Sequence, residues 1–306
     1  MGCPVETDRL GIATLPRHVC ATFFGHTDYV TWRRALLVSL AVVLCLGGWT
    51  FYYEPSSLEL RRYELALAGW PHELDGIEIA LLSDLHVGSP YYGLDKLEEV
   101  VRRVNASEPD LVLLAGDYVV DGVSGGRFVP PEDIAFVLAE LDAPLGVFAV
   151  LGNHDWWLDG PRVRRAFESA GIRVLDDQAV RVSEFWLVGL GDWWEAPPDI
   201  PQVLASIDID DDAPVVAFTH NPDVFPKIPP RVILTLAGHT HGGQVRLPFF
   251  GAPIVPSRYG DRYVHGHIVE NGRHLFVTSG LGTSIIPARF RVPPEIALLR
   301  LSASEP

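Results

Sequence analysis

The chain has 306 residues, 48% of them hydrophobic and 10% aromatic, so it can bury a sizeable core and is not a disordered protein. Its formal net charge of −15 disfavours broad binding to nucleic acid, and an anionic substrate would need local positive charge, which bound metal could supply. Cys3, Cys20 and Cys45 all precede the polar motifs described below. The region of those motifs therefore has no internal disulfide and no thiolate metal site, and cysteine usage leaves the cellular compartment open.

The N-terminal region divides into a tail and a candidate membrane helix. Residues 1–32 are mixed in charge and lack clear periodicity, which indicates a tail. From Ala35 to Tyr53 no side chain is charged, and the run approaches the ~20 residues that span a bilayer core. We therefore predict one transmembrane anchor over residues 33–53, followed by a Pro-Ser-Ser-containing linker over residues 54–57.

The flanks of this apolar run predict its orientation. Arg33 and Arg34 precede it and an aromatic belt follows it, so the positive-inside rule places the N-terminus in the cytoplasm and the remainder of the chain outside. Arg61 and Arg62 weaken this bias. A cleaved signal sequence is the alternative, but no small-x-small site follows the run. A buried helix of a soluble protein is disfavoured because nothing polar gives the run a wet face.

After residue 57, short apolar runs alternate with amphipathic segments, which is typical of strands joined by helices. Helices are predicted at residues 93–105, 134–141, 161–170 and near 200–207. Strands are predicted at residues 77–83, 111–115, 147–151, 172–175, 179–182, 185–190, 214–218, 232–237, 266–270, 274–279 and 295–301. The sequence therefore predicts one α/β domain over residues 58–306, a sandwich of two mixed β-sheets flanked by helices.

Five short polar motifs each follow a predicted strand. They are Asp84-Leu85-His86, Gly116-Asp117, Gly152-Asn153-His154-Asp155, Thr219-His220-Asn221 and Gly238-His239-Thr240-His241. Loops at strand ends bring together ligands from distant parts of a chain. One such motif is a weak signal, since an Asp or His after a strand is more often a cap or a satisfied polar group. Five together indicate a two-metal hydrolase.

In full and in order, the motifs resemble the signature of the calcineurin-like metallophosphoesterase superfamily, over roughly residues 77–302. Further runs resemble its membrane-anchored bacterial phosphodiesterase branch. These runs are Gly238-His-Thr-His-Gly-Gly-Gln-Val-Arg-Leu-Pro, Ser279-Gly-Leu-Gly-Thr-Ser and Pro293-Pro-Glu-Ile. The resemblance implies hydrolysis of a phosphodiester or a pyrophosphate, and relatives in the superfamily cleave the pyrophosphate of UDP-diacylglucosamine.

The resemblance also implies a ligand set for two metal ions. The first metal would be held by Asp84, His86 and His241, the second by Asn153, His220 and His239, and Asp117 would bridge both. Oxygen and imidazole donors without thiolate suit Mn²⁺, Fe or Zn²⁺ and do not choose among them. Two such ions can share a hydroxide and clamp phosphoryl oxygens for in-line attack. His154 resembles the family's general acid or transition-state stabiliser, and Asp155 would orient its imidazole.

Several functions remain open from the sequence. The expected partners are the membrane and a phosphate ester, either lipid-linked or nucleotide-linked. A protein phosphatase is disfavoured, since no arginine follows Gly116-Asp117 closely. A nuclease shares the chemistry but needs a basic groove, which the acidic composition argues against. An inactive metal-bound membrane scaffold would show loss of ligands, and none is lost. Trp156, Trp157, Trp193 and Trp194 could form an apolar wall for a substrate, although Trp pairs more often complete a core.

Overall fold

The structure, a computed structural model, describes residues 26–208 and 210–304. The chain divides into two compact units, one ending at Leu46 and one beginning at Gly47. The expected tail covers residues 1–32, so most of it lies outside the described residues. The observed boundary also falls within the segment that we predicted as the anchor.

The first unit is represented by helix α1 (His26–Gly48). Thr31–Ser56 has a mean hydropathy of 2.0 and is long and apolar enough to cross a membrane. An apolar helix was expected here, and its length and composition are those of either a membrane anchor or a signal sequence.

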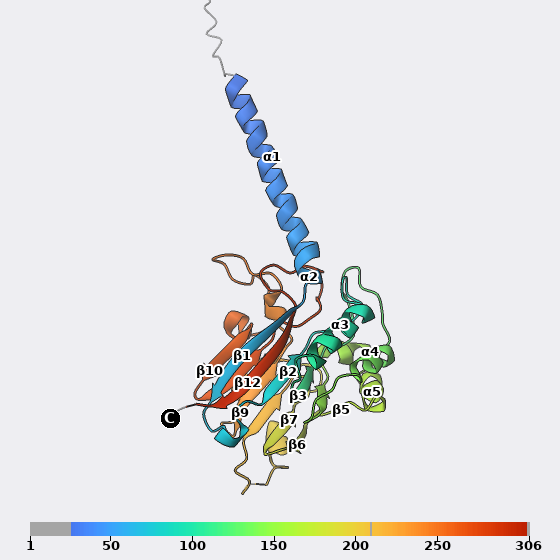
Figure 1. The fold of residues 1–306 in the computed structure, drawn as a ribbon, viewed down its shortest axis with the longest axis vertical. Helices are drawn as coiled ribbons and strands as arrows, with labels where there is room; N and C mark the ends of the chain where they lie inside the picture. Colours follow the sequence, from blue (N-terminus) through green and yellow to red (C-terminus); the bar gives the residue numbers. More distant parts are fainter. Residues whose placement is uncertain (1–25, 209, 305–306) are drawn as a thin grey trace, which may run out of the picture. The chain divides into compact units, whose positions relative to one another are not determined.

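The second unit contains two six-stranded sheets (Figure 1). The first sheet has the order β1 (Glu59–Leu67), β12 (Glu295–Ala303), β2 (Glu78–Leu82), β3 (Leu111–Ala115), β4 (Val147–Val150) and β5 (Arg173–Val174). Only the β12–β2 pair is antiparallel, with Leu299 opposite Ile79. The second sheet has the order β10 (Gly266–Glu270), β11 (Arg273–Val277), β9 (Val232–Ala237), β8 (Val215–Phe218), β7 (Phe185–Gly189) and β6 (Gln178–Val182). Its central strands β7, β8 and β9 are parallel, which confirms the predicted α/β fold with two mixed sheets.

The core lies between the sheets and on their outer faces because strand side chains alternate in direction. On β2, Ile79 and Leu81 pack between the sheets, whereas Ala80 and Leu82 pack on the helical side. That side is covered by α3 (Leu94–Asn105), α4 (Pro131–Leu138) and α5 (Asn153–Ser169), which lie together in Figure 1. The outer face of the second sheet is covered by shorter elements, namely α6 (Ile200–Leu204), η3 (Pro222–Lys227) and η5 (Gly260–Tyr263).

Two elements differ from the prediction for local reasons. Strand β1 was missed because it is an edge strand whose charged side chains alternate toward solvent, which hides its apolar pattern. Helix α5 was expected only from residue 161 but begins at Asn153, with a break in helical geometry at Asp159 (φ −178°, ψ 82°). Pro161 has no N–H and cannot donate a hydrogen bond to the preceding turn of the helix. The Asp159 carboxylate accepts a hydrogen bond from the Arg162 amide and so caps the second half of α5.

The expected linker at residues 54–57 is also different in the structure. Glu54–Ser56 forms a helical turn, α2, directly after the π-helical turn η1 (Trp49–Tyr53). The Glu54 side chain is buried and accepts hydrogen bonds from the indole of Trp49 and from the amide of Val292, both at 2.5 Å. The segment is therefore fixed to the domain, because a buried carboxylate must have its hydrogen bonds satisfied. Proline at a helix N-terminus is compatible with such a turn.

Phe276 provides a test of the inter-sheet core. Its ring is fully buried and packs edge-on against Tyr63, with ring centroids 4.7 Å apart. We expect Phe276→Ala to lower the free energy of unfolding by about 3–5 kcal/mol, because it leaves a cavity between the sheets. Phe136→Ala is the matched control, since Phe136 is 74% exposed, and should change stability by about 0.5 kcal/mol or less. Denaturant unfolding in detergent measures both, and equal effects would contradict this assignment of the core.

Candidate metal centre

All five polar motifs lie at the C-terminal ends of parallel strands. Asp84 and His86 follow β2, Asp117 follows β3, and Asn153 follows β4 at the start of α5. The second sheet contributes His220 after β8 and both His239 and His241 after β9. Because the strand ends of the two sheets meet here, residues up to 157 positions apart in the sequence come together, as the pair Asp84–His241 shows.

One group consists of Asp84, His86 and His241. The Nε2 atoms of His86 and His241 lie 3.1 Å apart, and the two rings are stacked at 5.0 Å. His241 Nε2 is also 3.3 Å from Asp84 Oδ1. Two imidazole nitrogens and a carboxylate oxygen that converge in this way are a set of donors that could hold a metal ion.

A second group consists of Asp117, His220 and His239. His220 Nε2 lies 3.1 Å from Asp117 Oδ2 and 3.1 Å from His239 Nδ1. Asp117 Oδ2 is also 3.7 Å from His86 Nε2 in the first group. Asp117 therefore lies between the two groups, which makes the buried cluster consistent with a binuclear metal site.

Asn153 completes the expected set. Its side-chain Oδ1 is buried and has no hydrogen-bond partner among the described residues. The next amide, that of His154, donates to Asp117 Oδ1 at 2.9 Å, so Asn153 adjoins the second group. An unsatisfied buried amide oxygen is costly unless a further partner binds it, and a cation is a suitable partner.

Backbone carbonyls orient two of the imidazoles. His220 Nδ1 lies 2.8 Å from the carbonyl oxygen of Ala115, and His86 Nδ1 lies 3.3 Å from that of Val119. An N–H at Nδ1 that donates to a carbonyl leaves the Nε2 lone pair free to face a metal. Both Nε2 atoms do face the other expected ligands.

Burial keeps most of these imidazoles neutral, which is the form that binds metal. It lowers the pKa of His86 and that of His239 to about 3, and that of His241 well below its usual value. For His220 burial acts in the same direction, but the charge of Asp117 outweighs it and raises the pKa to about 10. Burial opposes ionisation of Asp117, yet His220 and His154 hold its pKa well below the usual range.

The backbone at the site is strained. Five of the seven expected ligands have positive φ angles, namely Asp84 (54°), His86 (41°), Asp117 (57°), His239 (70°) and His241 (50°). Non-glycine residues rarely adopt this region, and such strain clusters at functional sites. Two glycines allow the close approach: a Cβ on Gly116 would lie 2.6 Å from the Gly152 nitrogen, and one on Gly238 would lie 1.9 Å from Ser83 Oγ.

Asp155 has a different role from the one we expected. Its carboxylate accepts hydrogen bonds from the amides of Gly152 (2.9 Å), Asp117 (2.8 Å) and Tyr118 (2.9 Å). No described hydrogen bond joins it to the imidazole of His154, whose Nδ1 has no partner. Buried carboxylates bind backbone amides where loops would otherwise leave those donors unpaired, so Asp155 positions the loop of Asp117 and does not orient His154.

The structure separates the two tryptophan pairs. Trp156 packs with the helical core, and Trp193 packs on the outer face of the second sheet. Trp157 and Trp194 instead contact expected site residues, with ring centroids 4.6 Å from His154 and 4.5 Å from His239 respectively. Both of these rings are partly exposed, so each offers an apolar surface beside the metal centre.

The sequence motifs did not indicate Asp192, a buried carboxylate whose Oδ2 has no hydrogen-bond partner in the part of the chain that the structure describes. Its Oδ1 accepts from the amides of Trp194 and Glu195, which fixes the turn that bears Trp194. Burial raises the pKa of Asp192, and the nearby charge of His220 offsets part of this increase. The Asp192 carboxylate therefore interacts electrostatically with the second group. The signal was available, since Gly191-Asp192 follows a strand in the same way as Gly116-Asp117.

The donor set fits divalent metal ions. Carboxylate and imidazole groups converge without thiolate, because Cys45 in α1 is the only cysteine among the described residues. Such ligands suit Mn²⁺, Fe or Zn²⁺.

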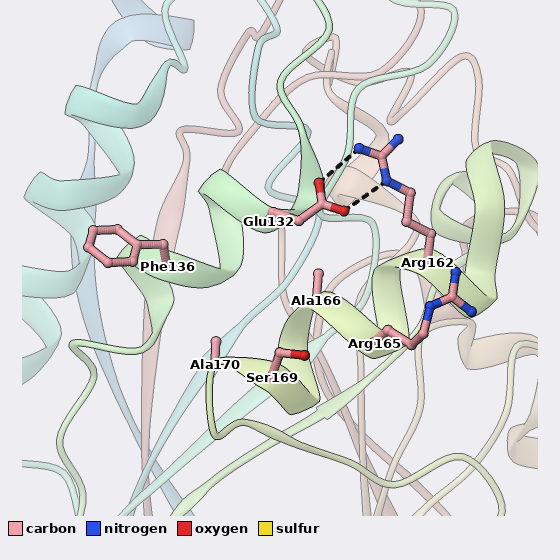
Figure 2. Close-up of a pocket in the computed structure, with 7 residues that line it drawn as sticks. All are labelled: Glu132, Phe136, Arg162, Arg165, Ala166, Ser169 and Ala170. Carbon is pink, nitrogen blue, oxygen red and sulfur yellow. Dashed lines mark hydrogen bonds and ion pairs between the residues drawn. The ribbon is translucent and has the colours of Figure 1, made fainter.

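A separate surface hollow of about 540 Å³ lies between α4 and α5 and is lined by Glu132, Phe136, Arg162, Arg165, Ala166, Ser169 and Ala170. Figure 2 shows Glu132 paired there with Arg162 through two bonds, and none of the expected metal ligands lines this hollow.

Comparison with known proteins identifies the family. Residues 77–271 match the family model for the calcineurin-like phosphoesterases. The chain is 31% identical over 287 residues to a Bacillus subtilis (strain 168) protein, the uncharacterized metallophosphoesterase YkuE, over 89% of this chain and 98% of the relative. It is 33% identical over 279 residues to phosphodiesterase YaeI of Escherichia coli (strain K12), over 88% and 98% respectively. UDP-2,3-diacylglucosamine pyrophosphatase LpxG of Chlamydia trachomatis serovar D is 27% identical over 325 residues, covering 87% of this chain and 96% of that protein. Together with the buried groups of carboxylates and imidazoles, these matches show that the chain is a metallophosphoesterase that belongs to the calcineurin-like phosphoesterase family.

Proposed function

We propose that this metallophosphoesterase hydrolyses phosphodiester or pyrophosphate bonds with two divalent metal ions. The observation that carries the proposal is the position of Asp117 between two groups of buried ligands. A bridging carboxylate holds two cations close enough to act on one phosphoryl group. The printed activities of two relatives, a phosphodiesterase and a pyrophosphatase, support the same classes of bond.

The assignment of residues follows the two groups. Asp84, His86 and His241 would hold one ion, Asn153, His220 and His239 would hold the other, and Asp117 would serve both. When bound, such a pair of ions supplies a nucleophile at neutral pH and neutralises charge on the phosphoryl oxygens. The protein keeps the site dry and holds the ligands in their strained conformations. Asp155 positions Asp117 through the backbone.

His154 is assigned as the proton donor to the leaving group. It is less buried than the ligands, and its ring lies 4.7 Å from that of His86. Its Nδ1 is buried and has no hydrogen-bond partner within the described residues, so this nitrogen is available to a group bound at the site. Because His154 also groups with His86 and Asp117 within 4.8 Å, a role as a metal ligand is the alternative that experiment must exclude.

For the cellular location, we propose a single-pass membrane protein related to a membrane-anchored branch of the family. The support is the apolar helix within Thr31–Ser56, preceded by Arg33 and Arg34 in the sequence. By the positive-inside rule the N-terminus is cytoplasmic and the catalytic domain lies on the outer side. The proposed domain order is a tail (residues 1–32), an anchor (33–53), a helical junction in place of the linker (54–57) and the phosphoesterase domain (58–306).

Hydrolysis by this protein should depend on added divalent metal. We expect the full-length protein, purified in detergent, to hydrolyse a bis-aryl phosphate when Mn²⁺ is added and to lose this activity with a chelator, because both groups of ligands are complete. Turnover is measured by release of the aryl alcohol. Activity without metal, or none with any divalent ion in a folded protein, would contradict the proposal.

The second prediction separates the proton donor from the bridging ligand. His154→Ala should retain both metals but lower kcat by on the order of 10²–10⁴, the usual contribution of a positioned acid. This loss should be smaller for an aryl ester than for a substrate with a poor alkoxide leaving group, which needs protonation more. Asp117→Asn should instead reduce metal content, because the bridging carboxylate balances two cations.

Metal analysis and kinetics on both substrates distinguish these outcomes. His72→Ala is the control, since that imidazole is 77% exposed in the turn η2 (His72–Leu74) and should change neither quantity. A His154 variant that loses a metal, or that cleaves both substrates at the wild-type rate, would show that the role assigned to His154 is wrong.

The third prediction concerns membrane anchoring. The full-length protein should remain with membranes through high-salt and alkaline washes, because a helix satisfies its own backbone hydrogen bonds in lipid. Protease added to intact spheroplasts of an expressing bacterium should digest the catalytic domain. Complete protection of that domain would mean that the proposed orientation is reversed, and release by the washes would mean that the helix is not an anchor.

A further inference from the structure

Two loops of the catalytic domain expose a group of large apolar side chains. The group, here called the apolar rim, consists of Leu247, Phe249, Phe250, Ile254, Ile285 and Ile286. Phe249 is fully exposed, Phe250 is 83% exposed and Ile285 is 68% exposed. Single exposed apolar residues are ordinary, but six in two adjoining loops mark an interaction surface.

Hydrogen bonds join the two loops into one surface. The Gln244 side chain donates to the Ser284 carbonyl at 3.0 Å and accepts from the Ser284 amide at 2.7 Å. The backbones of Gln244 and Arg246 bond that of Phe290 at 2.8 and 2.9 Å. The base of the 285–286 turn is therefore fixed to the base of the 247–254 loop.

The charge of these loops differs from that of the whole protein. Residues 242–260 and 279–294 contain no Asp or Glu, although the formal net charge of the chain is −15. They contain four arginines, of which Arg289 is buried and Arg291 is exposed. An apolar tip with basic residues and without acidic ones is complementary to a bilayer with anionic headgroups, and the rest of the acidic surface is not.

The segment that follows the apolar helix is bonded to the same loops. The Arg289 amide donates to the carbonyl of Thr50 at 2.9 Å, and the Val292 amide donates to Glu54. Thr50 and Glu54 belong to the stretch that is long and apolar enough to cross a membrane. In Figure 1 the orange and red loops lie at the same end of the domain as α2. The rim is thus at the end of the domain where the chain would leave a bilayer.

Both loops also begin at the metal centre. The first starts directly after His241, at Gly242 and Gly243. In the second, the Gly282 amide donates to the Asp84 carbonyl at 2.6 Å, and a Cβ on Gly280 would lie 2.6 Å from Asp84 Cβ. The loops therefore connect expected ligands at one end with exposed apolar tips at the other.

We propose that the apolar rim docks the catalytic domain on an anionic lipid bilayer and thereby presents the metal centre to phosphate esters that carry lipid tails. The second half of this statement rests on the proposed phosphoesterase function, whereas the first half does not. The rim side chains enter the headgroup region, and the exposed Arg291 faces anionic lipid. A lipid-linked substrate can then reach the site while its tails stay in the leaflet.

Docking is tested with fluorescent labels on the full-length protein in phosphatidylglycerol-containing vesicles. In a background with Cys3→Ser, Cys20→Ser and Cys45→Ser, an environment-sensitive dye is attached at Phe249→Cys or at the matched control Phe136→Cys. We expect the Phe249 label to shift to shorter wavelength and to be quenched by nitroxide-bearing lipids, and the Phe136 label to be quenched by aqueous iodide. Equal iodide quenching of both labels would overturn the proposal, and so would protection of the Phe249 label from both quenchers, which would indicate a protein partner.

The consequence for substrate is tested with Phe249→Asp/Phe250→Asp and with Phe136→Asp as the control. The rim variant should lose about tenfold or more in kcat/KM on a phosphodiester lipid in vesicles, while its rate on soluble bis-aryl phosphate stays within about twofold, because only access has changed. Equal losses on both substrates would overturn the role in access. Lipid quenching of the Phe249 label in a protein without phosphoesterase activity would overturn the proposed function and leave docking intact.

Discussion

Burying several carboxylates and imidazoles at one place is the constraint on which the rest of the structure depends. Asp84, Asp117, Asp155 and Asp192 are all removed from water near the strand ends of the two sheets. Each buried charge is costly unless hydrogen bonds or cations compensate for it. Asp155 obtains compensation from backbone amides, whereas Asp84 and Asp117 face pairs of imidazole nitrogens that lie 3.1 Å apart. Metal ions would provide the missing positive charge. The ions needed for hydrolysis would then also stabilise the fold.

The scaffold holds these groups at the expense of local backbone strain. The sandwich supplies short, largely buried strands, and the left-handed residues that follow β2, β3 and β9 turn the side chains of Asp84, Asp117 and His239 inward. Carbonyls of β3 and of the loop after it orient two imidazoles. Because the same loop is held by Asp155, the first half of α5 and the carboxylate of Asp117 form one unit. A change at Asp155 therefore acts on the metal centre through the backbone of Asp117.

Access to the centre comes from a different part of the molecule. Trp157 and Trp194 border the site, and the loops that carry the apolar rim begin at its ligands. Arg289 stabilises one of these loops from within, since its buried guanidinium donates to the carbonyls of Ser279, Gly282 and Val292. Burial lowers the pKa of Arg289 to about 10, which still leaves the group charged at neutral pH. The loop is thus rigid at its base and apolar at its tip, a suitable combination for holding a catalytic site at a membrane surface.

The sequence by itself determined the fold class and the positions of the strands that bear the site, because buried parallel strands give uninterrupted apolar runs and each polar motif directly follows one. It did not predict β1, whose polar face hides its period, or the first half of α5, whose helical state depends on Asp155 binding the amides of Gly152 and Asp117. Only the tertiary structure decided that Asp155 binds backbone amides. The tertiary structure also decided that Trp157 and Trp194 border the site, while Trp156 and Trp193 complete cores. These are contacts between residues far apart in the chain, or choices between neighbouring side chains, and local pattern cannot resolve them because they depend on how the two sheets pack.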